Sequence, residues 1–301
     1  MIELSEEYYK PQTIEGFPVT ETMKRCWAAN FEVLSELDRI CSSLGIRYYA
    51  AWGTLLGTVR HKGFVPWDDD VDIAMLRPDL NCLMKMPSEA LPQGWSLHSC
   101  HNTDHYHKTL YRLITGTEID ISEEHLKNYH GFPYPIGIDI SPVDFIPRQE
   151  EEREMQKAMY LIAATGQTLW TDPASSPEER ERQARITEEN LGVTLDREGD
   201  MAQQFTRLMD AVSAMYGPEE GDTVGEYHYI AAGNHTPKPV SDYLNAEKMI
   251  FGPTMIRIPL CYEELLRERY GDYHKFIRGA SSHDYPYYKD MEKRLKSYEK
   301  V

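Results

Sequence analysis

An aspartate-rich segment that follows a glycine turn constrains this chain more than any other part of the sequence. Residues 52–60 have the sequence WGTLLGTVR, and residues 63–73 have the sequence GFVPWDDDVDI. Side chains alternate between the two faces of a strand, so Asp70 and Asp72 would share one face while the apolar residues beside them enter a core. Two carboxylates on one face can bind a hard cation together with substrate phosphates. The segment therefore predicts a metal-dependent phosphoryl-transfer site.

The surrounding pattern predicts a strand, a turn, a helix and a second strand, which is the order found in nucleotidyltransferase folds. Apolar residues recur at helical spacing over residues 22–44, and Gly45 is placed to end that helix. Strands are expected over residues 47–52, 70–76, 95–100, 108–114 and 137–143. Helices are expected over residues 53–60, 149–170, 177–190, 201–216, 261–270 and 287–300, and a hairpin over 249–259. Ser176, Pro177 and Glu179 form a start signal for the helix at 177–190, because they can satisfy free backbone donors as an N-cap, an N1 proline and an N3 glutamate.

The composition changes near Arg148, where long charged segments rich in Ala, Met and Leu begin. We therefore predict an α/β (α+β) fold with a nucleotidyltransferase-like mixed sheet, a helical insertion and C-terminal helical segments. The expected divisions are a catalytic core over residues 1–147, a helical insertion over 148–220, and a C-terminal segment over 221–301 that completes the catalytic domain.

The motif around residues 52–73 resembles that of the LicD family, whose other branch contains fukutin and fukutin-related protein. The family pattern is an aromatic residue, x-Gly-Thr/Ser-Leu-Leu-Gly-x-x-Arg, and then Gly-Phe-Ile-Pro-Trp-Asp-Asp-Asp-Ile-Asp. The sequence IDISPVD at residues 138–144 resembles the family's later acidic strand, and YGDY at residues 270–273 resembles its C-terminal motif. The resemblance covers roughly residues 20–145 and 250–273. Ser141 departs from it, because the family prefers a bulky apolar residue there.

Asp139 is the expected third acid of the site. It lies between two isoleucines, and an isolated carboxylate is costly to bury unless it is paired or bound to metal. The resemblance implies that a third carboxylate from a later strand completes the site, as a metal ligand or as a base; a buried salt bridge is the structural alternative. Asp144 is a reserve candidate. Either Asp68 or Asp69 is expected to cap the loop or to support Arg60 or Lys62. Asp69 lies on the opposite face from Asp70 and Asp72, and Asp68 shares their face only if the strand already runs there, which Pro66 disfavours.

The phosphates of a nucleotide are expected at the turn formed by Gly53 and Thr54, because free N–H groups at a helix N-terminus favour anions. The candidate phosphate-binding cations are Arg60, His61, Lys62, Lys108 and Arg112. The tyrosines Tyr227, Tyr229, Tyr285, Tyr287 and Tyr288 either pack in the core or hold a quaternary ammonium group.

The donor atoms of five residues between positions 98 and 107 suit zinc, but their spacing favours a structural or acceptor-binding role. They are His98, Cys100, His101, His105 and His107. The five cysteines of the chain are scattered, which argues against a disulfide framework.

The net charge of −17 makes nucleic acid an unsuitable partner, because Lys and Arg supply most of that affinity. No apolar run approaches the roughly 20 residues of a spanning helix, and the polar, acidic start of the sequence does not resemble a signal peptide. A cytoplasmic protein with no transmembrane segment, in peripheral contact with a membrane-bound acceptor, is the resulting expectation.

By resemblance, the reaction is transfer of phosphocholine from CDP-choline to a hydroxyl of a cell-surface glycan or glycolipid precursor, such as lipopolysaccharide or teichoic acid, with release of CMP. Asp70, Asp72 and Asp139 would bind Mg²⁺ or Mn²⁺ and form the catalytic set. The enzymatic alternatives are transfer of another CDP-activated polyol phosphate, such as ribitol phosphate, and nucleotidyl transfer. The alternative outside enzymes is an acidic binding protein or a catalytically silent subunit.

Overall fold

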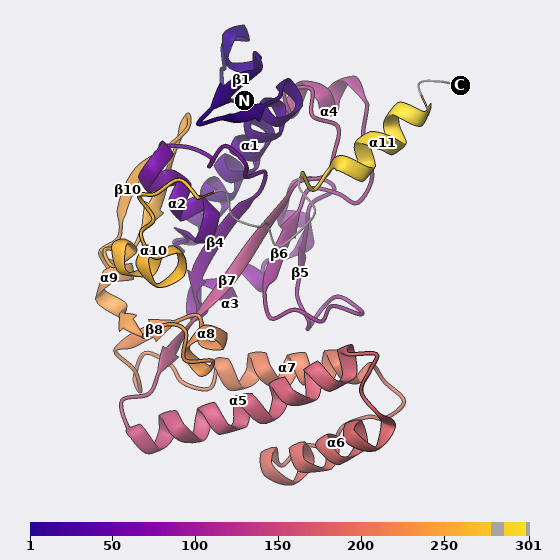
Figure 1. Ribbon diagram of the computed structural model, residues 1–301, viewed down its shortest axis with the longest axis vertical. Coiled ribbons are helices and arrows are strands. Elements are labelled where there is room, and N and C mark those ends of the chain that lie inside the picture. The colour runs from indigo at the N-terminus through magenta and orange to yellow at the C-terminus, as the bar shows by residue number, and fades with distance from the viewer. Residues whose placement is uncertain (278–285, 299–301) are drawn as a thin grey trace.

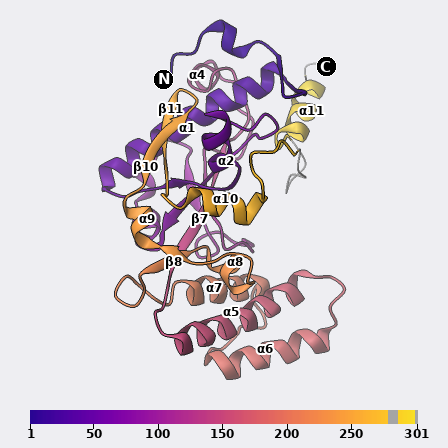
Figure 2. The same ribbon diagram turned by 60° about the vertical axis from the view of Figure 1, so that its left-hand side comes forward.

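A computed structural model describes residues 1–277 and 286–298 of the chain, and side chains as far as residue 296. Its centre is a mixed sheet, and three helices form a separate layer below the lower end of this sheet in the view of Figure 1. The N-terminal hairpin, β1 (Gln12–Ile14) and β2 (Phe17–Val19), lies at the opposite end of the molecule from that layer in both views (Figure 2).

The central strands have the order β3-β4-β7-β6-β5, and β8 pairs with the far end of β7 and with β9. Their bounds are β3 (Tyr49–Ala50), β4 (Val71–Leu76), β5 (Ser96–His98), β6 (Tyr111–Ile114), β7 (Gly137–Ile146), β8 (Thr223–Gly225) and β9 (Lys238–Pro239). Strands β4 and β7 are parallel, and the other pairs are antiparallel. The predicted mixed sheet is therefore confirmed.

The main core lies between this sheet and α1 (Glu21–Leu44), which buries apolar residues along most of its length. The Thr20 side chain accepts the Met23 N–H at the start of α1, and Gly45 adopts a left-handed conformation at its end. The Trp27 ring stacks on the Phe64 ring with a centroid distance of 5.4 Å. This packing holds the loop before β4 against α1.

The remaining helices outside the three-helix layer are short. They are α2 (Trp52–His61), α3 (Arg77–Met84), α4 (Glu123–Asn128), α8 (Tyr227–Ala231), α9 (Val240–Leu244), α10 (Tyr262–Tyr270) and α11 (Lys289–Tyr298), with 3₁₀ turns at Glu6–Tyr9 and Ser88–Ala90. The expected hairpin is formed by β10 (Glu247–Phe251) and β11 (Thr254–Ile258).

The separate layer consists of three long helices: α5 (Glu150–Thr171), α6 (Pro177–Leu191) and α7 (Met201–Ser213). They fall within residues 148–220, for which a helical insertion was predicted, and this layer is called the insertion below. The start of α6 has the capping box expected from its serine, proline and glutamate. Gly166 of α5 allows a close approach to α7, because a Cβ at this position would overlap the Phe205 ring.

Several element boundaries differ from those predicted. The strand expected at residues 47–52 contains only Tyr49 and Ala50, because α2 already begins at Trp52. The strands β8 and β9 were not predicted, since two or three residues are too few to show an alternating pattern. No helix in residues 1–277 or 286–298 is long and apolar enough to cross a membrane.

Candidate active site

A cleft of about 940 Å³ contains most of the residues singled out from the sequence. Its lining comes from the start of α2, the segment before β4, the strands β6 and β7, the helices α8 and α10, and residues 273–277. The charged residues that line it are Arg60, Asp68, Asp70, Asp72, Lys108, Arg112, Asp139, Arg269 and Lys275. Acidic and basic side chains therefore share one cavity.

The aspartates beside and within β4 separate in the expected way. Asp70 and Asp72 line the cleft. Asp69 does not line it; this residue is fully buried, and its carboxylate accepts the backbone N–H of Tyr287 at 2.6 Å. Asp69 and Asp70 precede β4, which begins at Val71, so strand alternation does not account for their difference.

Asp68 also lines the cleft, where sequence analysis predicted only a supporting role for it. It lies in the loop before β4, so the alternation of a strand does not apply to it. The backbone carbonyl of Asp68 accepts the indole N–H of Trp27 at 2.7 Å, which fixes the loop on α1. This tertiary contact holds the backbone of Asp68 in place beside the other aspartates.

The carboxylates are close enough to affect each other's protonation. Burial, followed by the charges of Asp70 and Asp72, raises the pKa of Asp68 well above its usual range. Burial and the charges of Asp70 and Asp139 likewise raise the pKa of Asp72. Oxygen atoms of Asp68, Asp69 and Asp70 lie within 4.8 Å of one another. An oxygen-only donor set with excess negative charge fits a hard divalent cation such as Mg²⁺ or Mn²⁺.

Thr54 was predicted to bind phosphate together with Gly53, but it has a different role in the structure. Thr54 is buried, and its hydroxyl accepts the backbone N–H of Asp72 at 2.9 Å, so it positions β4 instead of facing the cleft. Gly53 does line the cleft. A Cβ on Gly53 would overlap the Oδ2 atom of Asp68, so the close approach of this carboxylate requires glycine.

We expect Gly53→Ala to lower the turnover number at least tenfold without unfolding the protein. The added methyl displaces the Asp68 carboxylate, while alanine favours the helical conformation of α2 by up to about 1 kcal/mol relative to glycine. Steady-state kinetics and thermal unfolding should be measured on the same preparation. Unchanged turnover would show that the position of Asp68 does not matter.

Asp139 lies directly beside Asp72, because these two residues are partners in the parallel β4–β7 ladder. Arg112 is the antiparallel partner of Asp139 on the other side. The guanidinium of Arg112 donates two hydrogen bonds to the Asp139 carboxylate, one of them 2.8 Å long. The three side chains form a row across β6, β7 and β4. Asp139 therefore forms an ion pair and also lines the cleft. Sequence analysis had treated a salt bridge and a place in the acidic site as alternatives.

Asp144, the reserve candidate, lies farther along β7 and does not line the cleft. It is almost fully buried, and its carboxylate accepts hydrogen bonds from Arg77. Asp144 therefore belongs to an ion-pair network at the other end of the strand.

Arg60 lines the cleft from the last turn of α2. One guanidinium nitrogen donates to the Tyr273 carbonyl at 2.8 Å, and the guanidinium carbon lies 4.6 Å from the centroid of the Phe276 ring. The other terminal nitrogen is buried and has no hydrogen-bond partner among the described residues. This leaves a donor that a substrate phosphate could satisfy.

His61 and Lys62 do not line the cleft, in contrast to the predicted phosphate role. His61 lies 3.4 Å from the Glu15 carboxylate, and the Lys62 ammonium donates to the Val59 carbonyl at 3.2 Å. Successive residues of a helix point about 100° apart, so residues next to Arg60 cannot share its direction.

A cation that sequence analysis missed comes from α10. Arg269 lines the cleft, and its guanidinium carbon lies 4.3 Å from the Trp52 ring centroid and 5.6 Å from that of Tyr229. Arg269 directly precedes the YGDY motif, which was the one sequence signal for this region. Of the tyrosines considered above, Tyr229 and Tyr287 line the cleft, Tyr227 and Tyr288 are buried in cores, and Tyr285 lies outside the described residues.

Ser141, which departs from the family pattern, lies between Trp52 and the buried carboxyl group of Glu226. Its hydroxyl lies 3.1 Å from the indole nitrogen of Trp52, which donates to it. Burial raises the pKa of Glu226, next to Ser141 and Trp52, to about 8. A bulky apolar residue at position 141 would remove this hydrogen-bond acceptor from Trp52.

Residues 45–160 match the family model described as LicD/FKTN/FKRP, nucleotidyltransferase domain. The matched range contains the acidic strand, the four cleft-lining residues of β6 and β7, and the first half of α5.

Similar proteins include two whose names describe a transferase. A lipopolysaccharide cholinephosphotransferase LicD of Haemophilus influenzae is 45% identical over 47 residues, which are 16% of this chain and 18% of that protein. The human ribitol 5-phosphate transferase FKRP is 35% identical over 66 residues, which are 22% of this chain and 13% of that protein. An uncharacterized protein of Rickettsia prowazekii is 32% identical over 78 residues, 26% of each chain. The similarity thus spans about a quarter or less of the length of these relatives.

Proposed function

Because this chain belongs to the LicD family through the nucleotidyltransferase domain at residues 45–160, we propose that it is a metal-dependent phosphotransferase. The proposed reaction moves phosphocholine from CDP-choline to a hydroxyl group of a cell-surface glycan or glycolipid precursor, and CMP is released. Ribitol phosphate, or another CDP-activated polyol phosphate, is the second candidate for the transferred group.

The most direct support for this proposal is that acidic and basic side chains line the same cleft. Asp68, Asp70 and Asp72 would hold Mg²⁺ or Mn²⁺, because all three line the cleft and the charges of Asp70 and Asp72 act on Asp68. The Arg112 guanidinium, which lines the same cleft, is engaged by Asp139. A bound ion would offset negative charge on the diphosphate and on the departing CMP. Arg60, Lys108 and Arg269 line the same cleft and can receive phosphate oxygens.

The residues of the chain would then act on the acceptor and donor as follows. The cations hold the diphosphate so that the acceptor hydroxyl faces the phosphorus atom that carries choline. The acceptor oxygen forms a bond to that phosphorus, and the bond from the same phosphorus to the CMP oxygen breaks. Asp139, oriented by Arg112, is the proposed acceptor of the hydroxyl proton.

Two observations bear on the transferred group. The rings of Trp52 and Tyr229 already face a cation, the Arg269 guanidinium, so the same wall of the cleft offers electron-rich faces to a trimethylammonium group. The similarity to a cholinephosphotransferase favours the same group. The similarity to a ribitol 5-phosphate transferase keeps the polyol as the alternative.

Phosphorus NMR can decide between the donors. The protein is incubated with CDP-choline or CDP-ribitol, a hydroxylated acceptor extract and Mg²⁺, and the release of CMP is followed. CMP from CDP-choline only supports the proposal, and CMP from CDP-ribitol only replaces choline by the polyol. If neither donor reacts and neither stabilises the protein in a Mg²⁺-dependent manner, the chain is a binding protein or a silent subunit.

A further inference from the structure

The polar side chains on one face of α7 hold the loop between β5 and β6. Asp200, Gln203, Arg207 and Asp210 follow each other at intervals of three or four residues, so they share one face of the helix. Gln203 donates to the carbonyls of Cys100 and Thr103, and Arg207 donates to the carbonyl of Cys100. The loop of residues 99–107 is therefore anchored on the insertion along its length.

Two imidazoles of this loop converge on one carboxylate oxygen at the start of α7. The Nδ1 atom of His105 lies 2.7 Å from the Oδ2 atom of Asp200, and the Nε2 atom of His107 lies 2.8 Å from the same oxygen. The other oxygen, Oδ1, accepts the backbone N–H of Gln203 at 3.0 Å. The Nε2 atom of His107 also lies 3.0 Å from Oδ1. The helix thus holds the Asp200 carboxylate in place while its Oδ2 atom faces both imidazole nitrogens.

We propose that His105, His107 and Asp200 form a binding site for Zn²⁺ or a similar borderline divalent cation, separate from the acidic cluster of the cleft. Two imidazole nitrogens and one carboxylate oxygen are ligands of the type that Zn²⁺ takes in proteins. A hydrogen bond to the second carboxylate oxygen is the kind of outer contact that orients a metal-bound carboxylate.

The positions of the ligand atoms require little change to accept the ion. Tetrahedral ligands at 2.0–2.1 Å from Zn²⁺ are separated by about 3.3 Å, so each imidazole nitrogen must move away from the Asp200 oxygen by roughly half an ångström. The side chains are 82%, 35% and 22% exposed for His105, His107 and Asp200, respectively. An ion can therefore enter from solution, and a water molecule can complete the coordination.

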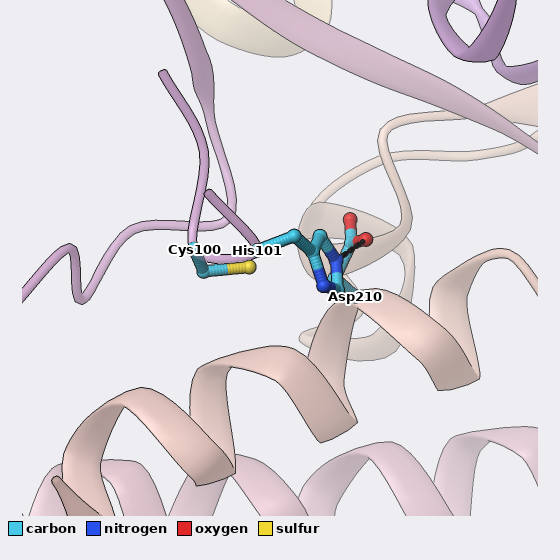
Figure 3. Close-up of side chains that lie close together, drawn as sticks. All are labelled: Cys100, His101 and Asp210. Carbon is cyan, nitrogen blue, oxygen red and sulfur yellow. Dashed lines mark hydrogen bonds and ion pairs between the residues drawn. The ribbon is translucent and has the colours of Figure 1, made fainter. Parts of the chain in front are cut away.

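A neighbouring group of similar composition is less suitable. Cys100, His101 and Asp210 also lie close together, and the imidazole of His101 points at the Asp210 carboxylate (Figure 3). Both oxygens of Asp210 are already used, however: one accepts from Arg77 at 3.0 Å and the other from Tyr111 at 2.8 Å. The adjacent guanidinium would also repel a second cation.

The proposed site would have a consequence for the cleft. His107 is followed directly by Lys108, which lines the cleft, and the His107 carbonyl accepts a hydrogen bond from Gln167 of α5. A metal ion shared by the loop and α7 would fix this wall of the cleft to the insertion.

The test is metal binding by the full, tag-free chain after removal of bound metal with a chelator. Binding of Zn²⁺ and the visible absorption of Co²⁺ are measured in excess Mg²⁺, which occupies oxygen-only sites. We expect one equivalent of Zn²⁺ to bind, Co²⁺ to show the intense bands of tetrahedral coordination, and Zn²⁺ to raise the melting temperature.

Matched variants assign the ligands. The double variant His105→Gln/His107→Gln should lose the site, and Asp200→Asn should weaken binding more than about tenfold, although asparagine can still cap α7. His98→Gln is the control, because His98 lies in the same segment but contacts Ser96 and Thr103. Absence of binding by the wild type, unchanged binding by the double variant, or loss of binding in His101→Gln alone would each overturn the proposal.

Discussion

Asp70→Asn and Asp72→Asn are each expected to lower phosphoryl transfer about a thousandfold or more at saturating Mg²⁺. Each substitution keeps the volume of the side chain but removes a charge that would hold the cation, and each tenfold loss in rate corresponds to about 1.4 kcal/mol of transition-state stabilisation. Both side chains line the cleft, so the change acts where the donor would bind. Release of CMP, measured under single-turnover conditions, reports the chemical step.

The same variants should not destabilise the metal-free protein. Like charges and burial raise the pKa of Asp72, so its carboxylate opposes folding at neutral pH and its removal relieves that opposition. Thermal unfolding in chelator should give melting temperatures equal to or above that of the wild type. Asp104→Asn, on an exposed residue outside the cleft, is the control for the change of charge. A variant that keeps near-normal turnover would exclude its aspartate as an essential ligand.

Arg77→Met is expected to lower the free energy of unfolding by about 3–5 kcal/mol, because it leaves buried carboxylates without their cation. Arg77 donates to Asp144 of β7 and to Asp210 of α7, with one distance of 3.0 Å to each. All three side chains are at most 6% exposed. The ion pairs thus connect the sheet to the insertion. Urea unfolding monitored by far-UV circular dichroism measures the loss.

A compensated variant identifies the cause of that loss. Arg77→Met combined with Asp144→Asn and Asp210→Asn removes the unpaired charges, so it should recover part of the stability. His101 moderates the effect on Asp210, since its hydrogen bond to that carboxylate raises the pKa of His101 to about 10 and keeps it charged at neutral pH. If Arg77→Met alone costs less than about 1 kcal/mol, the network does not anchor the insertion.

Local sequence patterns predicted the parts of the structure that depend on neighbouring residues. The aspartate-rich segment predicted the strand that carries Asp72, and helical spacing with Gly45 predicted α1 and its end. The serine, proline and glutamate at the start of α6 predicted its capping box. These features involve residues a few positions apart, and the geometry of one strand or helix fixes them.

Local patterns could not predict which residues distant in the sequence lie side by side in the fold. The row of Arg112, Asp139 and Asp72 depends on the pairing of three strands, two of them joined in parallel across more than 60 residues. Arg269 reaches Trp52 only because α10 packs on α2. Spacing along the chain contains no information about which strands pair or which helices pack.

The sequence by itself determined the acidic strand, the main helices and the resemblance that identifies the domain. The tertiary structure alone decided that Asp68 joins the cleft, that Thr54 supports β4, and that His61 and Lys62 point elsewhere. It also brought Asp200 to the histidines of the loop. The physical reason is that backbone periodicity fixes the direction of a side chain within its element, whereas burial of distant apolar surfaces fixes what that side chain faces.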